Sequence, residues 1–260
     1  MIIGDNPVWF AVFLTEFFGI LIINVITVIA FARIRHLRKR STYLIINLTV
    51  ADLLVGVVTG PLYYLNRHKE NNVFRWVIQL TFPMASQVNL SLISLERLHA
   101  TRFPFKHCLI TKRFYFKIII GSWLITFAIA FVMANLTKEV RSYAWASFSL
   151  LTLLVLTVSY IIVIVNVQRN PHSQNHGSLH MERKLSVTLF IVTAVSVLTI
   201  LPCAIYKSIP GHLQEKLSNP SRVEIYDMLT TIYFASSIVN PVVYAIRMQE
   251  FRKAVRNLVS

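Results

Sequence analysis

A few ionisable and amide side chains interrupt long apolar stretches of the sequence. Glu96 and Arg97 stand side by side at the end of one stretch, and Asp52 stands within another. Adjacent opposite charges hold one another in an ion pair, whereas a carboxylate with hydroxyl and amide oxygens nearby is the ligand set that a hard cation such as Na⁺ prefers. Each of these groups is costly to place in lipid, so we expect each to serve a function.

The apolar stretches have the length and composition of membrane-spanning helices. The chain has 260 residues, 55% hydrophobic and 14% charged, with a mean hydropathy of +0.59. Because helices satisfy their own backbone hydrogen bonds in lipid, we predict an all-α fold, a seven-transmembrane helix bundle forming one domain over 1–260. A short amphipathic helix at 248–259 is expected to follow the last span. The predicted spans are 8–32, 43–65, 73–98, 114–134, 143–168, 184–208 and 224–246.

Basic residues gather on one side of the predicted bundle. Of the 26 Lys and Arg residues, 18 fall in one set of connectors and helix ends and 8 in the other. This bias predicts a multi-pass protein whose N-terminus lies outside and whose C-terminus is cytoplasmic. The formal net charge of +15 is also typical of proteins that bind nucleic acid, but nucleic-acid binding does not explain the apolar stretches. Membrane lipid, and not nucleic acid, is therefore the expected surrounding.

Five motifs follow one another in a recognisable order. They are "GILIIN" with Asn24, "NLTVADLL" with Asp52, "ERL" at 96–98 followed by Pro104, Trp123 in the fourth span, and "NPVVY" at 240–244. Together they resemble the rhodopsin-like (class A) G-protein-coupled receptors, and the resemblance covers the whole chain. It implies a plasma-membrane receptor that transduces an extracellular ligand signal to a heterotrimeric G protein. No catalytic triad or phosphate loop is present, so we do not expect an enzyme.

The resemblance implies two buried functional centres. In the first, Arg97 is restrained at rest by Glu96 and by Glu182, and turns toward the G protein on activation. The other interpretation is an ordinary ion pair at a helix end. The activation switch and coupling residues are Glu96, Arg97, Tyr160, Glu182, Asn240, Pro241 and Tyr244. The second centre is a sodium pocket or, alternatively, a water-filled network without an ion. Its residues are Asn24, Asp52, Ser86, Ser236 and Asn240, with Asp52 as the Na⁺ ligand. Beyond Na⁺ as an allosteric ion, no cofactor is expected.

The resemblance also implies a ligand pocket in the outer half of the bundle. Its aligned residues are Gln79, Phe82, Trp145, Phe148, Ile200, Cys203, Lys207, Tyr226, Thr230 and Phe234. Gln79 stands where amine receptors carry an Asp, and Phe234 where opsins carry the retinal-linking Lys. A small apolar or amphipathic ligand of unknown identity is expected from this lining. Lys207 either pairs with a carboxylate or phosphate of that ligand or extends toward water as a snorkelling lysine.

Several positions depart from the family pattern. Asn72 stands near the expected cysteine of the third span, so the extracellular disulfide is absent, and Cys108 and Cys203 fall at opposite levels of the membrane. In the sixth span, Ile200 stands at the position where the family carries an aromatic switch residue. These departures resemble the melanocortin, lysophospholipid and cannabinoid neighbourhood of the family. They leave open a non-signalling, receptor-derived partner protein and, more weakly, a small-solute transporter. Asn135 begins an Asn-Leu-Thr glycosylation sequence in an outward loop.

Overall fold

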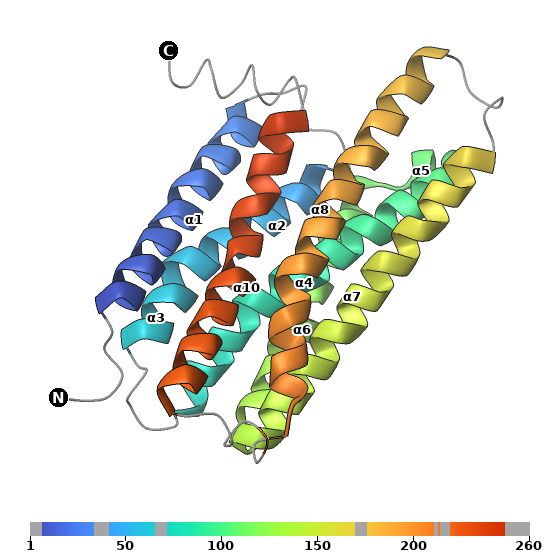
Figure 1. The fold of residues 1–260 in the computed structure, drawn as a ribbon. Helices are drawn as coiled ribbons and strands as arrows, with labels where there is room; N and C mark the ends of the chain where they lie inside the picture. The colour runs from blue at the N-terminus through green and yellow to red at the C-terminus, as the bar shows by residue number, and fades with distance from the viewer. Residues whose placement is uncertain are drawn as a thin grey trace, which may run out of the picture.

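A computed structural model describes residues 7–33, 42–65, 72–169, 176–210, 213 and 219–247, and its regular elements are helices. The helices lie side by side in a tilted bundle (Figure 1). The elements are α1 (Pro7–Arg33), α2 (Thr42–Leu54), η2 (Val55–Thr59), α3 (Gly60–Leu65), α4 (Val73–Arg102), α5 (Pro104–Leu109), α6 (Lys112–Ala134), α7 (Lys138–Arg169), α8 (His176–Ser208) and α10 (Asn219–Arg247). The amphipathic helix expected at 248–259 lies outside the described residues.

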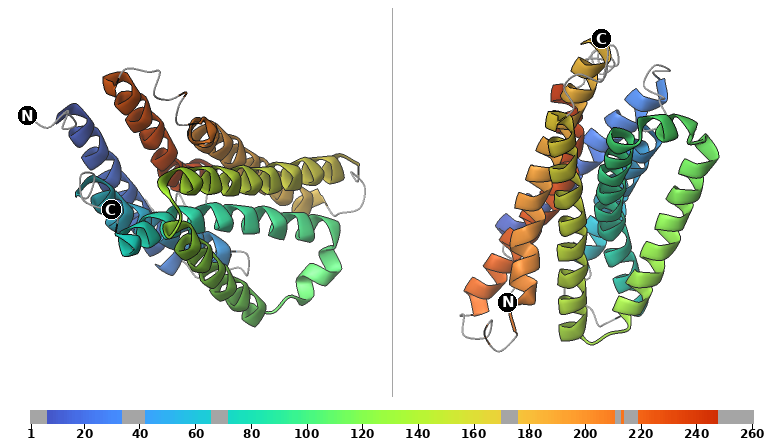
Figure 2. Two further views of the ribbon diagram at one scale, coloured as in Figure 1. Left: turned by 90° about the horizontal axis from the view of Figure 1, so that it is seen from below. Right: turned by 90° about the vertical axis from the view of Figure 1, so that its right-hand side faces the viewer.

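Helix α4 is the central element of the bundle, because it packs against α2, α6 and α7 and also contacts α5 and α8. Helix α6 lies at the edge (Figure 2). Three of the long helices begin earlier than their apolar residues indicate. The structure begins α7 at Lys138 rather than 143, α8 at His176 rather than 184, and α10 at Asn219 rather than 224. Hydropathy marks only the lipid-embedded part of a helix, whereas helical hydrogen bonding continues through the polar residues that precede it.

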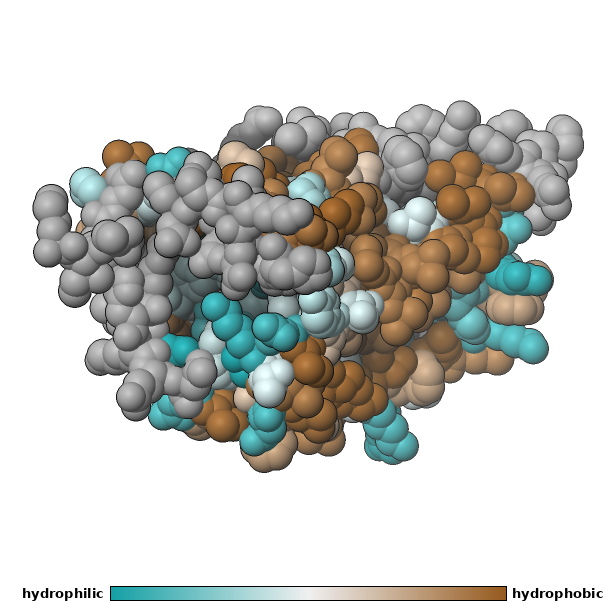
Figure 3. Space-filling view, turned by 60° about the horizontal axis from the view of Figure 1, so that its bottom comes forward, coloured by the Kyte–Doolittle hydropathy of each residue, from teal (hydrophilic) through white to brown (hydrophobic). Residues whose placement is uncertain are grey.

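The outer surface of the bundle is apolar, as lipid contact requires. A broad hydrophobic surface carries only scattered hydrophilic patches (Figure 3). Among the described residues, four segments are long and apolar enough to cross a membrane: Pro7–Phe31, Thr42–Tyr63, Lys112–Ala134 and Lys138–Asn166. Helices α4, α8 and α10 carry more polar residues, because they face the interior of the bundle. The protein is therefore a multi-pass membrane protein.

The interior consists of two apolar clusters separated by a polar layer. One cluster includes Phe31, Leu48 and Tyr160, and the other includes Phe17 and Trp145. Along α1, α2, α4 and α10 the buried members of the two clusters are separated by about two to three helical turns. The buried polar residues at this level are Asn24, Asp52, Ser86, Ser237 and Asn240. We call these five residues the polar core.

The second span is not a regular α-helix throughout. Gly60 N–H donates to Val55 O at the end of η2, a hydrogen bond between residues five apart that widens the helix. Pro61 follows, and its ring has no N–H and would clash with the carbonyl four residues earlier in a regular α-helix. Gly60 lies directly against the ring of Phe17 in α1. The wider turn and the missing side chain together let α1 and α3 approach closely.

Candidate functional site

The carboxylate of Asp52 is the centre of the polar core. Its Oδ1 accepts hydrogen bonds from Ser86 Oγ at 2.6 Å and Ser237 Oγ at 2.8 Å, and its Oδ2 accepts from Asn240 Nδ2 at 2.9 Å. The donors come from α4 and α10, and Asp52 itself is completely buried in α2. This one side chain therefore joins three helices, and any change of its charge or partners acts on all three.

Asn24 supports the polar core without touching Asp52. Its Nδ2 donates to Ile20 O at 2.9 Å and to Ser237 O at 3.1 Å, which ties α1 to α10. The side-chain oxygens of Asn24 and Asn240 are buried and have no hydrogen-bond partner among the described residues. A buried acceptor without a donor is costly. A hard cation would supply the missing positive charge, and the carboxylate, hydroxyl and amide oxygens of this core are the ligand types that suit Na⁺.

One member of the expected sodium set is displaced by a single residue. Ser236 does not bond to Asp52, because its Oγ donates to Tyr233 O at 2.7 Å in its own helix. Ser237 occupies the expected place instead. Neighbouring residues on an α-helix point about 100° apart, so only one of two adjacent serines can face α2. Both serines were available in the sequence, and residue type alone did not separate them.

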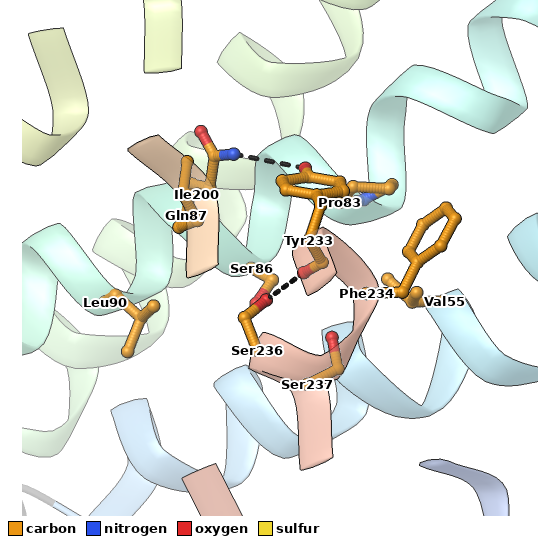
Figure 4. Close-up of a pocket in the computed structure, with 10 residues that line it drawn as sticks. All are labelled: Val55, Pro83, Ser86, Gln87, Leu90, Ile200, Tyr233, Phe234, Ser236 and Ser237. Atoms are coloured by element: carbon orange, nitrogen blue, oxygen red, sulfur yellow. Dashed lines mark hydrogen bonds between the residues drawn. The ribbon is translucent and has the colours of Figure 1, made fainter. Parts of the chain in front are cut away.

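A small cavity lies beside the polar core (Figure 4). It offers about 10 Å³ to the centre of a water-sized molecule, which is enough for about one water. Ser86 and Ser237, the two hydroxyls bound to Asp52, form part of its wall. The full lining is Val55, Pro83, Ser86, Gln87, Leu90, Ile200, Tyr233, Phe234, Ser236 and Ser237. Two residues of the expected ligand pocket, Ile200 and Phe234, therefore border a space next to the polar core.

Gln87 and Tyr233 connect this cavity to the outer half of the bundle. Gln87 Nε2 donates to Tyr233 Oη at 3.1 Å, and Thr152 Oγ1 donates to Gln87 Oε1 at 3.3 Å. The ring of Tyr233 packs edge-on against Trp145, with centroids 5.2 Å apart. The motifs did not identify this link between α4, α7 and α10. Helical periodicity could have indicated Tyr233, because it follows the predicted pocket residue Tyr226 by two turns on the same face of α10.

The inner end of α4 carries the adjacent acid and base. Arg97 Nε lies 3.1 Å from Glu96 Oε2, yet it makes no hydrogen bond to the described residues. Glu96 Oε1 accepts a hydrogen bond from Tyr115 Oη at 3.1 Å and lies 3.3 Å from His107 Nε2. Glu96 is thus anchored by α5 and α6, whereas Arg97 is held by an ion pair without a directed hydrogen bond.

Of the other expected switch residues, the structure describes some and not others. Tyr160 is buried in α7 and hydrogen-bonded to Thr193 of α8, with Arg97 close enough to interact electrostatically. Pro241 lies within α10. The side chains of Glu182 and Tyr244 lie outside the described residues, so a contact of Arg97 with either remains a prediction. Tyr115 and His107, which the motifs missed, are the observed partners of Glu96.

The expected ligand pocket is well packed. Trp145, Ile200, Cys203 and Phe234 belong to one buried apolar cluster, and Phe82 and Phe148 pack against it. The ring of Phe82 also lies edge-on to Trp123 of α6, on a side of α4 away from α8 and α10. Gln79 is half-buried, and Thr230 Oγ1 donates to Tyr226 O at 2.7 Å. Lys207 Nζ lies 3.8 Å from the ring centroid of Trp145.

The outer end of the bundle is closed by an arginine near the place of the absent disulfide. Arg141 is buried, its guanidinium lies 4.0 Å from the ring centroid of Trp76, and its Nη1 donates to Ala134 O and Leu136 O at 3.2 and 3.0 Å. It therefore ties α4 to the turn between α6 and α7. Asn72 caps α4 by accepting a hydrogen bond from Phe74 N–H.

The remaining polar candidates lie apart from these centres. Cys108 is exposed on α5 and Cys203 is buried in α8, both as free thiols. Asn135 is exposed at the end of α6, where its Nδ2 donates to Phe131 O at 2.8 Å. Its glycosylation stays a prediction. The described residues contain no cluster of three His, Cys, Asp or Glu that could hold a metal ion, so the oxygen-rich polar core is the cation candidate in this part of the chain.

Comparison with known proteins finds receptors that are similar to this chain. A model of the 7 transmembrane receptor (rhodopsin family) matches residues 23–144. The octopamine receptor beta-2R of Chilo suppressalis is 25% identical, over 91% of this chain and 75% of that protein. The lysophosphatidic acid receptor 2 of Mus musculus is 27% identical over 92% and 76%, and the D(1B) dopamine receptor of Xenopus laevis is 25% identical over 91% and 66%. Over about nine tenths of its length the chain is therefore similar to seven-transmembrane, G-protein-coupled receptors of the rhodopsin family.

Proposed function

We propose that the chain is a plasma-membrane receptor that passes an extracellular ligand signal to a heterotrimeric G protein. The observation that carries this proposal is the Glu96–Arg97 pair, in which two neighbouring helices anchor the acid, while the Nε atom of the base pairs with it by charge and has no hydrogen-bond partner among the described residues. Such a base can leave its partner when the helices move. The distribution of basic residues supports an outer N-terminus and a cytoplasmic C-terminus.

The ligand is proposed to be amphipathic. The relatives are named for amines and for lysophosphatidic acid. A cationic amine requires a carboxylate in the pocket, but α4 carries the neutral Gln79 where amine receptors have one. The aromatic and aliphatic lining around Trp145 and Phe148 favours a ligand with a substantial apolar part.

Phe105 is expected to contact the G protein. It follows Pro104 at the start of α5, its side chain is 88% exposed, and basic residues surround it. Phe105→Ala should lower G-protein dissociation about five- to tenfold, because an exposed aromatic anchor that fills a partner's pocket contributes more than 1 kcal/mol. The measurement is dissociation of each G-protein class in cells, at matched surface expression, without added ligand and with a lipid, nucleoside and peptide panel.

Leu124→Ala is the control for this experiment. Leu124 is exposed in the middle of α6 and faces lipid, so its loss should leave the signal unchanged. A wild-type receptor that reaches the surface and engages no G-protein class would contradict the proposed function. That result would favour the non-signalling partner protein, while ion-dependent solute uptake would favour a transporter.

Sodium is proposed to stabilise the resting state through the polar core. When bound, the ion supplies positive charge to the carboxylate of Asp52, while Ser86, Ser237 and Asn240 hold that carboxylate in place. Replacing external and internal Na⁺ by choline should raise the basal signal about fivefold or more, the lower range of allosteric couplings. Asp52→Asn should remove this response.

The matched control is Glu139→Gln, which neutralises an exposed acid in the first turn of α7. It should keep the wild-type response to sodium. Equal basal signals in sodium and choline for the wild-type receptor would reject the ion and leave a water-filled polar network.

A further inference from the structure

Lys207 lies in an aromatic site at the outer end of three helices. It stands in the last turn of α8, and its Nζ lies 3.8 Å from the ring centroid of Trp145 in α7 and 5.9 Å from that of Tyr226 in α10. Tyr206 packs against Tyr226 with centroids 6.4 Å apart. The ammonium group is therefore turned inward onto aromatic faces.

This position differs from that of a snorkelling lysine. A lysine that only snorkels extends its ammonium into water, whereas Trp145 is only 3% exposed. Among the described residues, no carboxylate, Asp227 included, lies within 4.0 Å of Lys207 Nζ. The contacts of the ammonium group with described side chains are the cation–π contacts with Trp145 and Tyr226. Such an attraction is weaker than a charge-assisted hydrogen bond to an anion in a partly desolvated site.

We propose that Lys207 is the anion-binding residue of this receptor, and that it exchanges the face of Trp145 for the carboxylate or phosphate head of an amphipathic ligand. This inference rests on the proposed function. The apolar body of the ligand contacts the aromatic side chains that surround the ammonium, and the head group forms the ion pair that the described residues do not provide.

The same contact connects the anion to the polar core. Trp145 packs edge-on against Tyr233, and the Tyr233 hydroxyl accepts a hydrogen bond from Gln87. Tyr233 and Gln87 both line the cavity beside Ser86 and Ser237, as Figure 4 shows. Removal of the ammonium from Trp145 frees the ring that supports Tyr233. The signal of ligand binding thus has a path although the sixth span carries Ile200 at its switch position.

The test uses four lipids with the same oleoyl chain on cells that express the receptor. They are oleoyl lysophosphatidic acid, oleic acid, zwitterionic oleoyl lysophosphatidylcholine and neutral monooleoylglycerol, each with G-protein dissociation as the readout. At least one of the two anionic lipids should activate the receptor, and comparison of these two separates phosphate from carboxylate. Lys207→Met should raise the concentration for half-maximal response about tenfold or more, since a charged hydrogen bond is lost.

Two further variants separate a binding role from a structural one. Lys207→Arg keeps the charge and also stacks on Trp, so it should retain most of the anionic response. Lys138→Met removes an exposed lysine from the same end of the bundle and should leave potency within about twofold, as expected for a surface charge.

Equal responses to the neutral and anionic lipids would overturn the inference. Unchanged potency of Lys207→Met would overturn it as well. Silence toward both anionic lipids would also overturn it, while a basal signal that depends on Phe105 would still support the proposed function. Absence of any G-protein signal from the wild-type receptor would instead count against the proposed receptor function. The experiment therefore distinguishes failure of the Lys207 inference from failure of the receptor function.

Discussion

Replacing Arg97 by alanine is expected to abolish G-protein dissociation while the receptor still reaches the cell surface. Glu96 keeps the hydrogen bond from Tyr115 and the neighbouring His107 after the change, so its carboxylate is not left without a partner. The Nε atom of Arg97 has no hydrogen-bond partner among the described residues, so removal of this side chain should cost the resting fold little. The loss should appear in signalling, on the order of tenfold or more for a charged contact with the partner.

The measurement is G-protein dissociation against surface-expressed receptor, with Arg97→Lys and Arg113→Ala beside it. Arg97→Lys keeps the charge but loses the planar fork, so a partial signal is expected. Arg113 is exposed at the start of α6 and controls for the loss of one inner positive charge. If Arg97→Ala signals like the wild type, the Glu96–Arg97 pair is only a helix-end ion pair.

Replacing Gly60 by alanine is expected to destabilise the fold strongly. A Cβ atom at this position would overlap the ring of Phe17, at its Cγ, Cδ1 and Cδ2 atoms. Phe17 cannot move away cheaply, because its ring stacks on Phe13 at 6.0 Å and packs edge-on against Phe234 at 5.4 Å. Overpacking of this kind costs about 1–3 kcal/mol or more. Surface expression and the melting temperature of the purified receptor should both fall.

Gly121→Ala is the matched control for this prediction. A Cβ at Gly121, within α6, meets no atom within 4 Å, so alanine should be neutral or stabilise the helix by about 0.5–1 kcal/mol. The double variant Gly60→Ala with Phe17→Leu should regain part of the lost stability, because the smaller side chain relieves the overlap. Equal melting temperatures for Gly60→Ala and the wild type would show that α1 and α3 are not closely packed in solution.

Residue types that are costly in lipid could be located from the sequence, because few such residues occur in the spans. Asp52 and Asn240 were expected in one centre, and the structure brings them into hydrogen-bond contact. The sequence could not show which of two adjacent serines contacts Asp52. Ser236 and Ser237 are chemically identical, and only the rotation of α10 distinguishes them. The widened turn in η2 was also not predictable, because it depends on tertiary contact with α1 as well as on Pro61.

Partners that come from outside a motif were the least predictable part of the site. Tyr115 and His107 approach Glu96 from α6 and α5, and nothing in the local sequence around Glu96 names them. Gln87 and Tyr233 were not among the predicted site residues, and their pairing depends on how α4 and α10 are rotated. Tertiary geometry, rather than residue type, decided these contacts.

The arginine clamp at the outer end has a consequence for biogenesis. Arg141, Trp76 and the carbonyls of Ala134 and Leu136 need no oxidation to associate. Closure of this end can follow helix packing in the membrane directly, without waiting for a thiol oxidase or for reshuffling of wrong crosslinks. We therefore expect this end to form without an oxidising compartment, and extracellular thiols have no covalent bond to cleave among these contacts.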